Sequence, residues 1–158
     1  MDAERRGILA GGELPTWGGA MSWDVLLLPL PEELTSIDDL PVDHVPPPVG
    51  SRSKVLELLR SAVPDIDLTD PAWGQLLGPT WVIEFSIGPG DPVESVMLHV
   101  RGGEDDVLPV IFRASRAIGC RPFDCSAGDL LREDDPRSWQ AFQAYRDRVI
   151  APNARATH

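Results

Sequence analysis

The segment from Trp81 to Gly102 constrains the fold most, because it alternates apolar and polar residues on both sides of a short connection rich in Gly and Pro. It reads WVIEFSIGPGDPVESVMLHVRG. A period of two predicts antiparallel strands joined as a hairpin. The apolar face consists of Ile83, Phe85, Ile87, Val96, Leu98 and Val100. The opposite face carries Glu84, His99 and Arg101, so the first question is whether these three side chains form a functional site.

The segments around this hairpin alternate between strand and helix patterns. Residues 23–30 predict a first strand, and residues 51–63 predict a helix with an apolar stripe at helical spacing. Residues 105–118 predict a second helix, in which Pro109 is tolerated because it falls in the first turn. Residues 120–126 predict a further short strand. The proline-rich stretch after the first strand and the polar stretch that contains Trp73 are both expected to be loops.

The order strand, helix, strand, strand, helix, strand is the split β-α-β-β-α-β arrangement of the ferredoxin-like fold. We therefore expect an α+β domain with a four-stranded antiparallel sheet and two helices on one face. A C-terminal helix, with Trp139 among its anchors, is expected to pack on or beside this domain. Trp23 and Trp81 are also expected in or at the edge of the core.

The expected domain organisation is simple for a chain of 158 residues. Residues 21–131 form the domain, and residues 132–151 contain the C-terminal helix. Residues 1–20 are rich in Gly without sustained periodicity and are expected to be a flexible extension, and residues 152–158 are expected to be a tail. The strand pattern opens directly after Met21, so we expect Met21 to be the native start and residues 1–20 to be an upstream extension, with Met1 as the alternative start.

The formal net charge of −11 excludes the usual nucleic-acid and anionic-membrane binders, which need a positive surface. It favours a basic protein partner, attracted by electrostatic steering. The sequence lacks an apolar run of about 20 residues and a secretory signal pattern, so a cytoplasmic location is expected.

The two cysteines and three histidines give no metal or cofactor motif. Cys120 and Cys125 lie five positions apart without C-x-x-C spacing, and we expect both to be buried free thiols. The histidines at positions 44, 99 and 158 are scattered along the chain. We therefore expect no metal and no cofactor.

The polar residues of the hairpin have two interpretations. A histidine between a carboxylate and a guanidinium can act as an acid/base group, but an exposed sheet face carries paired charges without any function. Trp73 lies in the stretch DPAWGQ, where it is either a binding anchor or, as we favour, a lid over the core. Neither pattern includes a nucleophile, so no catalytic residue is assigned. The candidate binding residues are Glu84, His99, Arg101 and Trp73.

Three short motifs resemble a family of small, acidic, single-domain bacterial proteins of uncharacterised function. They are MSWDV at residues 21–25, DPAWG at residues 70–74 and HVRGG at residues 99–103. The resemblance extends from about Met21 to Leu130 and implies that Met21 is the usual start. It implies no activity and no catalytic residues.

These observations favour a non-enzymatic interaction module, of the kind that includes immunity proteins and antitoxins, which binds a basic protein partner. The alternative is a small-molecule-binding domain or weak enzyme that uses the open sheet face around His99 and Arg101. A third possibility is a homodimer that covers Met97 and His99 by pairing two sheets. A pocket around His99 would favour the second interpretation, and a flat face would favour interaction.

Overall fold

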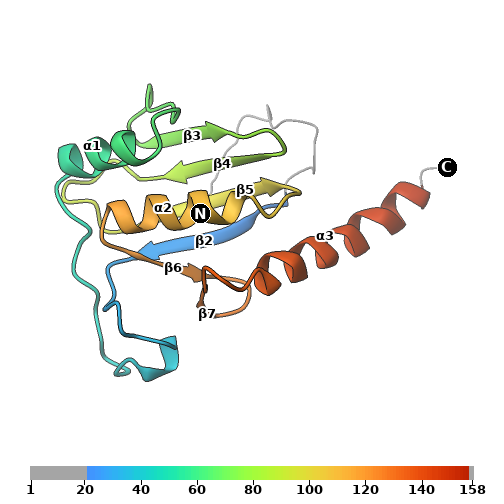
Figure 1. The fold of residues 1–158 in the computed structure, drawn as a ribbon, viewed down its shortest axis with the longest axis horizontal. Coiled ribbons are helices and arrows are strands. Elements are labelled where there is room, and N and C mark those ends of the chain that lie inside the picture. The colour runs from blue at the N-terminus through green and yellow to red at the C-terminus, as the bar shows by residue number, and fades with distance from the viewer. Residues whose placement is uncertain (1–20, 157–158) are drawn as a thin grey trace.

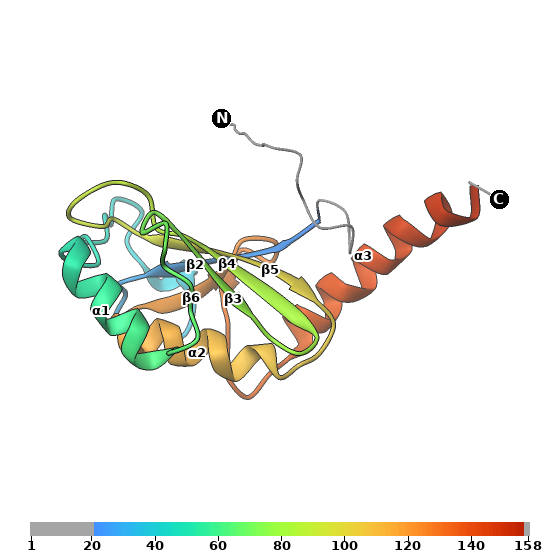
Figure 2. The same ribbon diagram turned by 90° about the horizontal axis from the view of Figure 1, so that it is seen from above.

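The computed structural model describes residues 21–156, and it describes the side chains of residues 21–148. The expectation of a flexible extension over residues 1–20 lies outside the described residues. The described chain is an α+β fold in which one antiparallel sheet carries two helices on one face (Figures 1 and 2). The α+β class that the element pattern predicts is therefore confirmed.

The sheet has six strands, not the expected four, and its strand order is β3-β4-β5-β2-β6-β7. The strands are β2 (Trp23–Leu28), β3 (Trp73–Leu77), β4 (Trp81–Ser86), β5 (Val96–Gly102), β6 (Arg121–Asp124) and β7 (Asp129–Leu130). All neighbouring strands are antiparallel. The expected hairpin is β4 and β5, and its register places Glu84 opposite His99.

The two additional strands occupy the edges of the sheet. The stretch expected to be a loop around Trp73 forms β3, in which Gly74 and Leu76 face inward and are buried. A Cβ atom on Gly74 would lie 2.8 Å from Leu68, so glycine allows this strand to pack closely. At the other edge, β7 has only two residues and follows a turn in which Gly128 has a φ of 75°.

The two helices on the sheet begin and end where the sequence predicts. Helix α1 (Arg52–Ala62) starts after Ser51, whose side chain accepts a hydrogen bond from the Lys54 backbone N–H. Helix α2 (Val107–Ala117) starts after Asp106, so Pro109 falls in its first turn. Helix α2 ends before Gly119, which adopts a φ of 70°. A short 3-10 helix, η1 (Ile37–Asp39), lies in the proline-rich connection.

Helix α3 (Arg137–Ala156) is held to the domain by its first turns and includes residues 152–156, which were expected to be a tail. Trp139 is fully buried, and its ring centroid lies 4.9 Å from that of Trp23 in β2. The rest of α3 extends away from the sheet (Figures 1 and 2). Among residues 21–156, no helix combines the length and the apolar character that a membrane span requires.

The core lies between the sheet and the two helices. Trp23, Trp81 and Trp139 are buried, as expected from the sequence. Cys120 is a buried free thiol, but Cys125 is exposed, so the expectation of two buried thiols is wrong for the second. Cys125 differs because it follows the last residue of β6 and lies in the turn that leads to β7.

Candidate functional site on the open sheet face

The face of the sheet opposite α1 and α2 carries parallel rows of side chains, and we call this surface the open face. Arg101 lies in the row that it forms with Leu77 and Val82. The strand register aligns a polar row of Gln75, Glu84, His99 and Asp24. The adjacent row is mainly apolar and consists of Trp73, Ser86, Met97, Leu26, Phe123 and Leu130. The candidate residues of the hairpin therefore lie in a continuous surface that crosses the sheet.

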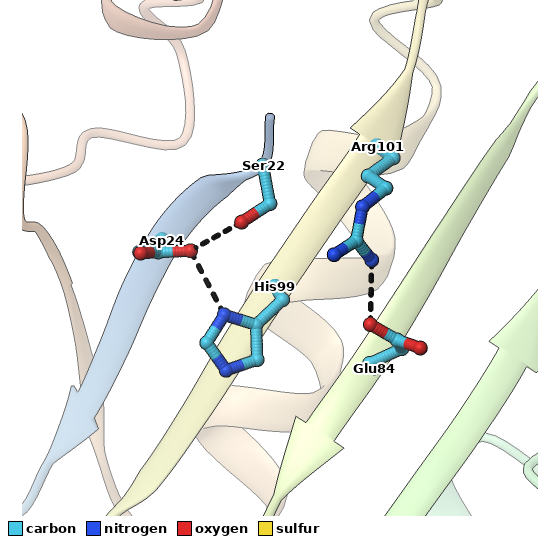
Figure 3. A network of polar contacts seen from close by, with 5 residues as sticks. All are labelled: Ser22, Asp24, Glu84, His99 and Arg101. Carbon is cyan, nitrogen blue, oxygen red and sulfur yellow. Dashed lines mark hydrogen bonds and ion pairs between the residues drawn. The ribbon is translucent and has the colours of Figure 1, made fainter. Parts of the chain in front are cut away.

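Glu84 on β4 and Arg101 on β5 form an ion pair on this face. The Arg101 Nη1 atom donates a hydrogen bond to Glu84 Oε1 over 2.5 Å (Figure 3). The side chains are only 10% exposed for Arg101 and 15% exposed for Glu84. Because a nearly buried charge is costly when it stands alone, each of these two residues depends on the other.

His99 is bonded to a residue that the sequence did not indicate, Asp24 on β2. The His99 Nδ1 atom lies 2.9 Å from Asp24 Oδ1 (Figure 3), and Ser22 Oγ donates to the same oxygen over 2.7 Å. Burial raises the pKa of Asp24, but the hydrogen bonds from His99 and Ser22 and the nearby positive charges outweigh this effect, so the net shift is downward. A carboxylate only accepts hydrogen bonds, so His99 Nδ1 donates the proton in this contact, and Nε2 takes no part in it.

Trp73 on β3 reaches over β4 to stack on His99. The ring centroids are 5.6 Å apart and the ring planes are inclined by 20°. Trp73 is 42% exposed, so the expectation that it lies in a loop and covers the core is wrong. The Trp73 side chain points outward from the edge strand β3, and it covers the imidazole of His99 instead of the core.

The structure brings all four predicted residues together, but in two pairs. Glu84 bonds to Arg101, while His99 contacts Asp24 and Trp73. The sequence reasoning missed Asp24 and Ser22. The inward positions of Trp23, Val25 and Leu27 could have indicated that Ser22 and Asp24 face outward, but only the β2–β5 register shows that Asp24 lies opposite His99.

Two pockets lie near this region, and neither includes His99 or Asp24. One of about 530 Å³ lies between the β6–β7 turn and the start of α3. The other, of about 310 Å³, lies at the end of β4 and β5 and includes Arg101. Among the described residues, no group of three or more His, Cys, Asp or Glu side chains is placed to hold a metal ion.

Comparisons with protein-family models, with curated proteins and with solved structures find no match to this chain. The three short motifs named in the sequence analysis all contribute residues to the open face. MSWDV supplies Ser22 and Asp24, DPAWG supplies Trp73, and HVRGG supplies His99 and Arg101. Motifs that are far apart in the sequence thus meet on one surface, and Glu84 is the additional residue that pairs with Arg101.

Proposed function

We propose that this protein is a non-enzymatic interaction module that binds a basic protein partner through the open face. The observation that carries this proposal is the exposed Trp73, which lies next to an apolar row on a sheet face that α1 and α2 do not cover. Trp and Met are enriched in the centres of protein interfaces. Trp73 and Met97 supply both residue types within the same row.

The charge of the chain supports a basic partner. The chain carries a formal net charge of −11, whereas on the open face itself Glu84 is paired with Arg101 and Asp24 is hydrogen-bonded to His99. A negative surface accelerates the encounter with a positive protein and makes that encounter sensitive to salt. This is the chemistry of an acidic immunity protein or antitoxin that neutralises a basic toxin, and we propose a role of this kind in the bacterial cytoplasm.

The experiment is affinity purification with the full chain as bait, in three forms. We expect the wild type to recover a basic protein, and we expect Trp73→Ala to lose it. Tyr145→Ala is the matched control, because Tyr145 is an aromatic residue that is 50% exposed on α3 and does not belong to the open face. Recovery of the same protein by Trp73→Ala at the wild-type level would contradict the proposal.

A second copy of the chain is an alternative occupant of the open face. Light scattering on the purified protein separates the two cases, since a homodimer persists without any other protein. If the wild type is a dimer and Trp73→Ala is a monomer, the face serves self-association. In that case the open face would bind a second copy of the chain, and the proposal of a basic protein partner would be wrong.

The contact between Asp24 and His99 favours a second candidate function, a small-molecule-binding domain or weak enzyme around His99 and Arg101. A carboxylate that holds Nδ1 orients the imidazole and leaves Nε2 to exchange a proton with a ligand. This function ranks second because neither pocket includes His99. A ligand that shifts the His99 ring signals in an NMR screen, and does so less in Asp24→Asn, would favour it.

We also propose that the inner strands β4-β5-β2-β6, with α1 and α2, form a ferredoxin-like unit to which β3 and β7 are added at the edges. The strand order and the antiparallel pairing support this interpretation. The edge strands matter for function because β3 supplies Trp73. An experimental structure with a different order of the four inner strands would contradict it.

A further inference from the structure

The turn between β6 and β7 lies beside the start of α3 (Figure 1), and a pocket of about 530 Å³ lies between them. One wall comes from Asp124 at the end of β6 and from the turn that follows it. The opposite wall comes from residues at helical spacing on α3, among them Ser138, Ala141 and Phe142. The volume lies within the range of small-molecule sites, roughly 300 to 1,000 Å³.

The Asp124 side chain points to the helix side of the sheet. Asp124 lies opposite Val25 in the antiparallel register, and Val25 faces the core. Trp139 of α3 lies on the same side, because it packs on Trp23, another inward position of β2. The Asp124 carboxylate is therefore directed to the side of the sheet on which α3 begins.

The Asp124 carboxylate is nearly buried, yet one of its oxygens is free. Asp124 is 2% exposed, and its Oδ1 atom accepts from the backbone N–H groups of Ser126 and Ala127 over 2.8 and 3.2 Å. Within residues 21–148, Oδ2 accepts no hydrogen bond, and no basic side chain forms an ion pair with Asp124. The sealed side-chain atoms that lack a partner in this part of the chain are all nitrogens, so Oδ2 is open to the pocket.

The charge of the pocket wall selects the kind of ligand. Its charged residues are Asp124, Asp135 and Arg137, so carboxylates outnumber cations. Arg137 donates to Asp135 through Nε and Nη2 over 2.9 and 2.7 Å, and its side chain is 86% exposed. Arg137 is therefore not the counter-ion of Asp124. A nearly buried carboxylate is costly without a cation, and a charged N–H donor forms the strongest hydrogen bonds to it.

We propose that this pocket binds the ammonium group of a small aliphatic amine, which donates a hydrogen bond to Asp124 Oδ2. Phe142 stacks on Trp139 with the ring planes inclined by 10°, so its ring is a fixed wall for the alkyl chain. Ala127 and Ala141 add apolar surface to the same pocket. The inference goes beyond the proposed function, because the Asp124 side chain lies on the opposite side of the sheet from the open face.

The test is a titration of the full chain with n-butylammonium chloride at neutral pH, followed by ¹H–¹⁵N NMR. The backbone N–H signals of Ser126 and Ala127 report on the site, because both groups donate to the Asp124 carboxylate. We expect butylammonium to shift these signals to saturation. Sodium chloride reproduces the ionic strength and 1-butanol reproduces the alkyl chain without the charge. The inference is overturned if either control shifts the two signals as much as butylammonium does.

Two aspartate variants show whether the Asp124 charge carries the binding. Asp124→Asn keeps an oxygen for the two backbone N–H groups but removes the charge, and we expect it to weaken butylammonium binding by about tenfold or more. Asp67→Asn is the matched control, because Asp67 also accepts a backbone N–H two residues ahead, from Thr69, but does not line the pocket. Equal affinities of Asp124→Asn and Asp67→Asn for butylammonium would overturn the inference. The wild-type titration decides the question on its own if Asp124→Asn fails to fold.

Discussion

Trp73 stacks on His99 across the full width of the intervening strand β4, with their ring centroids 5.6 Å apart. One residue lies on the edge strand β3 and the other on β5, so this contact joins elements that are separated in both sequence and sheet order. It also places an exposed aromatic ring directly over the polar row. The open face is therefore an organised surface in which Trp73, His99 and Asp24 form one chain of contacts.

The replacement Trp73→Ala is expected to lower the free energy of unfolding by about 1 kcal/mol. Trp73 is 42% exposed, so its removal loses the aromatic stack and some cross-strand packing without opening a cavity. Urea denaturation followed by circular dichroism measures this change. A loss as large as that of a core tryptophan would show that Trp73 supports the core, as the sequence suggested.

The replacement Trp139→Ala is expected to cost about 3 to 5 kcal/mol, because it empties a fully buried site next to Trp23. Tyr145→Ala, on the same helix but exposed, should change the free energy of unfolding by less than about 0.5 kcal/mol. Urea denaturation of the two variants tests how α3 is attached. Equal losses of unfolding free energy in the two variants would contradict the attachment of α3 to the domain through Trp139.

Asp24 should contribute to stability in a pH-dependent way, because its pKa is lower in the folded protein than its usual value. A carboxyl with a lowered pKa stabilises the folded state above the pKa of the unfolded chain, and this stabilisation is lost as the pH falls through the folded pKa. The difference in unfolding free energy between the wild type and Asp24→Asn should therefore be largest near neutral pH and shrink on acidification.

Chemical denaturation at a series of pH values measures this difference. Ser22→Ala is the control, since it removes one hydrogen bond to Asp24 but keeps the titrating group. We expect a smaller loss of stability with the same direction of pH dependence. If the difference in unfolding free energy between the wild type and Asp24→Asn stays constant from neutral to acidic pH, the Asp24 carboxylate does not have the lowered pKa that its hydrogen bonds imply.

The two cysteines should react very differently with a thiol reagent. Burial raises the pKa of Cys120 to about 12, so its reactive thiolate is scarce and shielded. Cys125 is exposed, although burial of its thiol and the charges of Asp24 and Asp124 raise its pKa as well. Native labelling should modify one thiol per chain, at a rate that increases with pH, and Cys125→Ser should abolish it. Labelling of Cys120 in the folded protein would contradict the structure.

The sequence predicted the parts of this fold that depend on local patterns. The hairpin, the two helices on the sheet and the shared face of Glu84, His99 and Arg101 follow from periods of two and of 3.6 residues, which are properties of single elements. The Ser51 cap of α1 follows from the residue type at the helix start. The position of Glu84 directly opposite His99 comes from the register of β4 and β5 in the structure. Local geometry therefore positioned half of the candidate site.

The remaining half depends on features that a local pattern does not contain. In β3 the inward position next to Trp73 is Gly74, so the apolar side chain that would reveal an alternating strand is missing. Asp24 meets His99 only through the pairing of β2 with β5, which are 75 residues apart at this point. With two residues, β7 is too short to produce any periodicity.

The central claim is that the open face binds a basic protein, and Met97→Lys tests it most directly. Met97 lies in the middle of the apolar row, next to Leu26, where a lysine adds a positive charge and disrupts close packing. Tyr145→Lys adds the same charge at an exposed position on α3. Isothermal titration calorimetry with the protein recovered by the wild type gives the dissociation constants. The account predicts that Met97→Lys weakens binding by about tenfold or more, or about 1.4 kcal/mol, while Tyr145→Lys changes it little; equal affinities for both variants would contradict it.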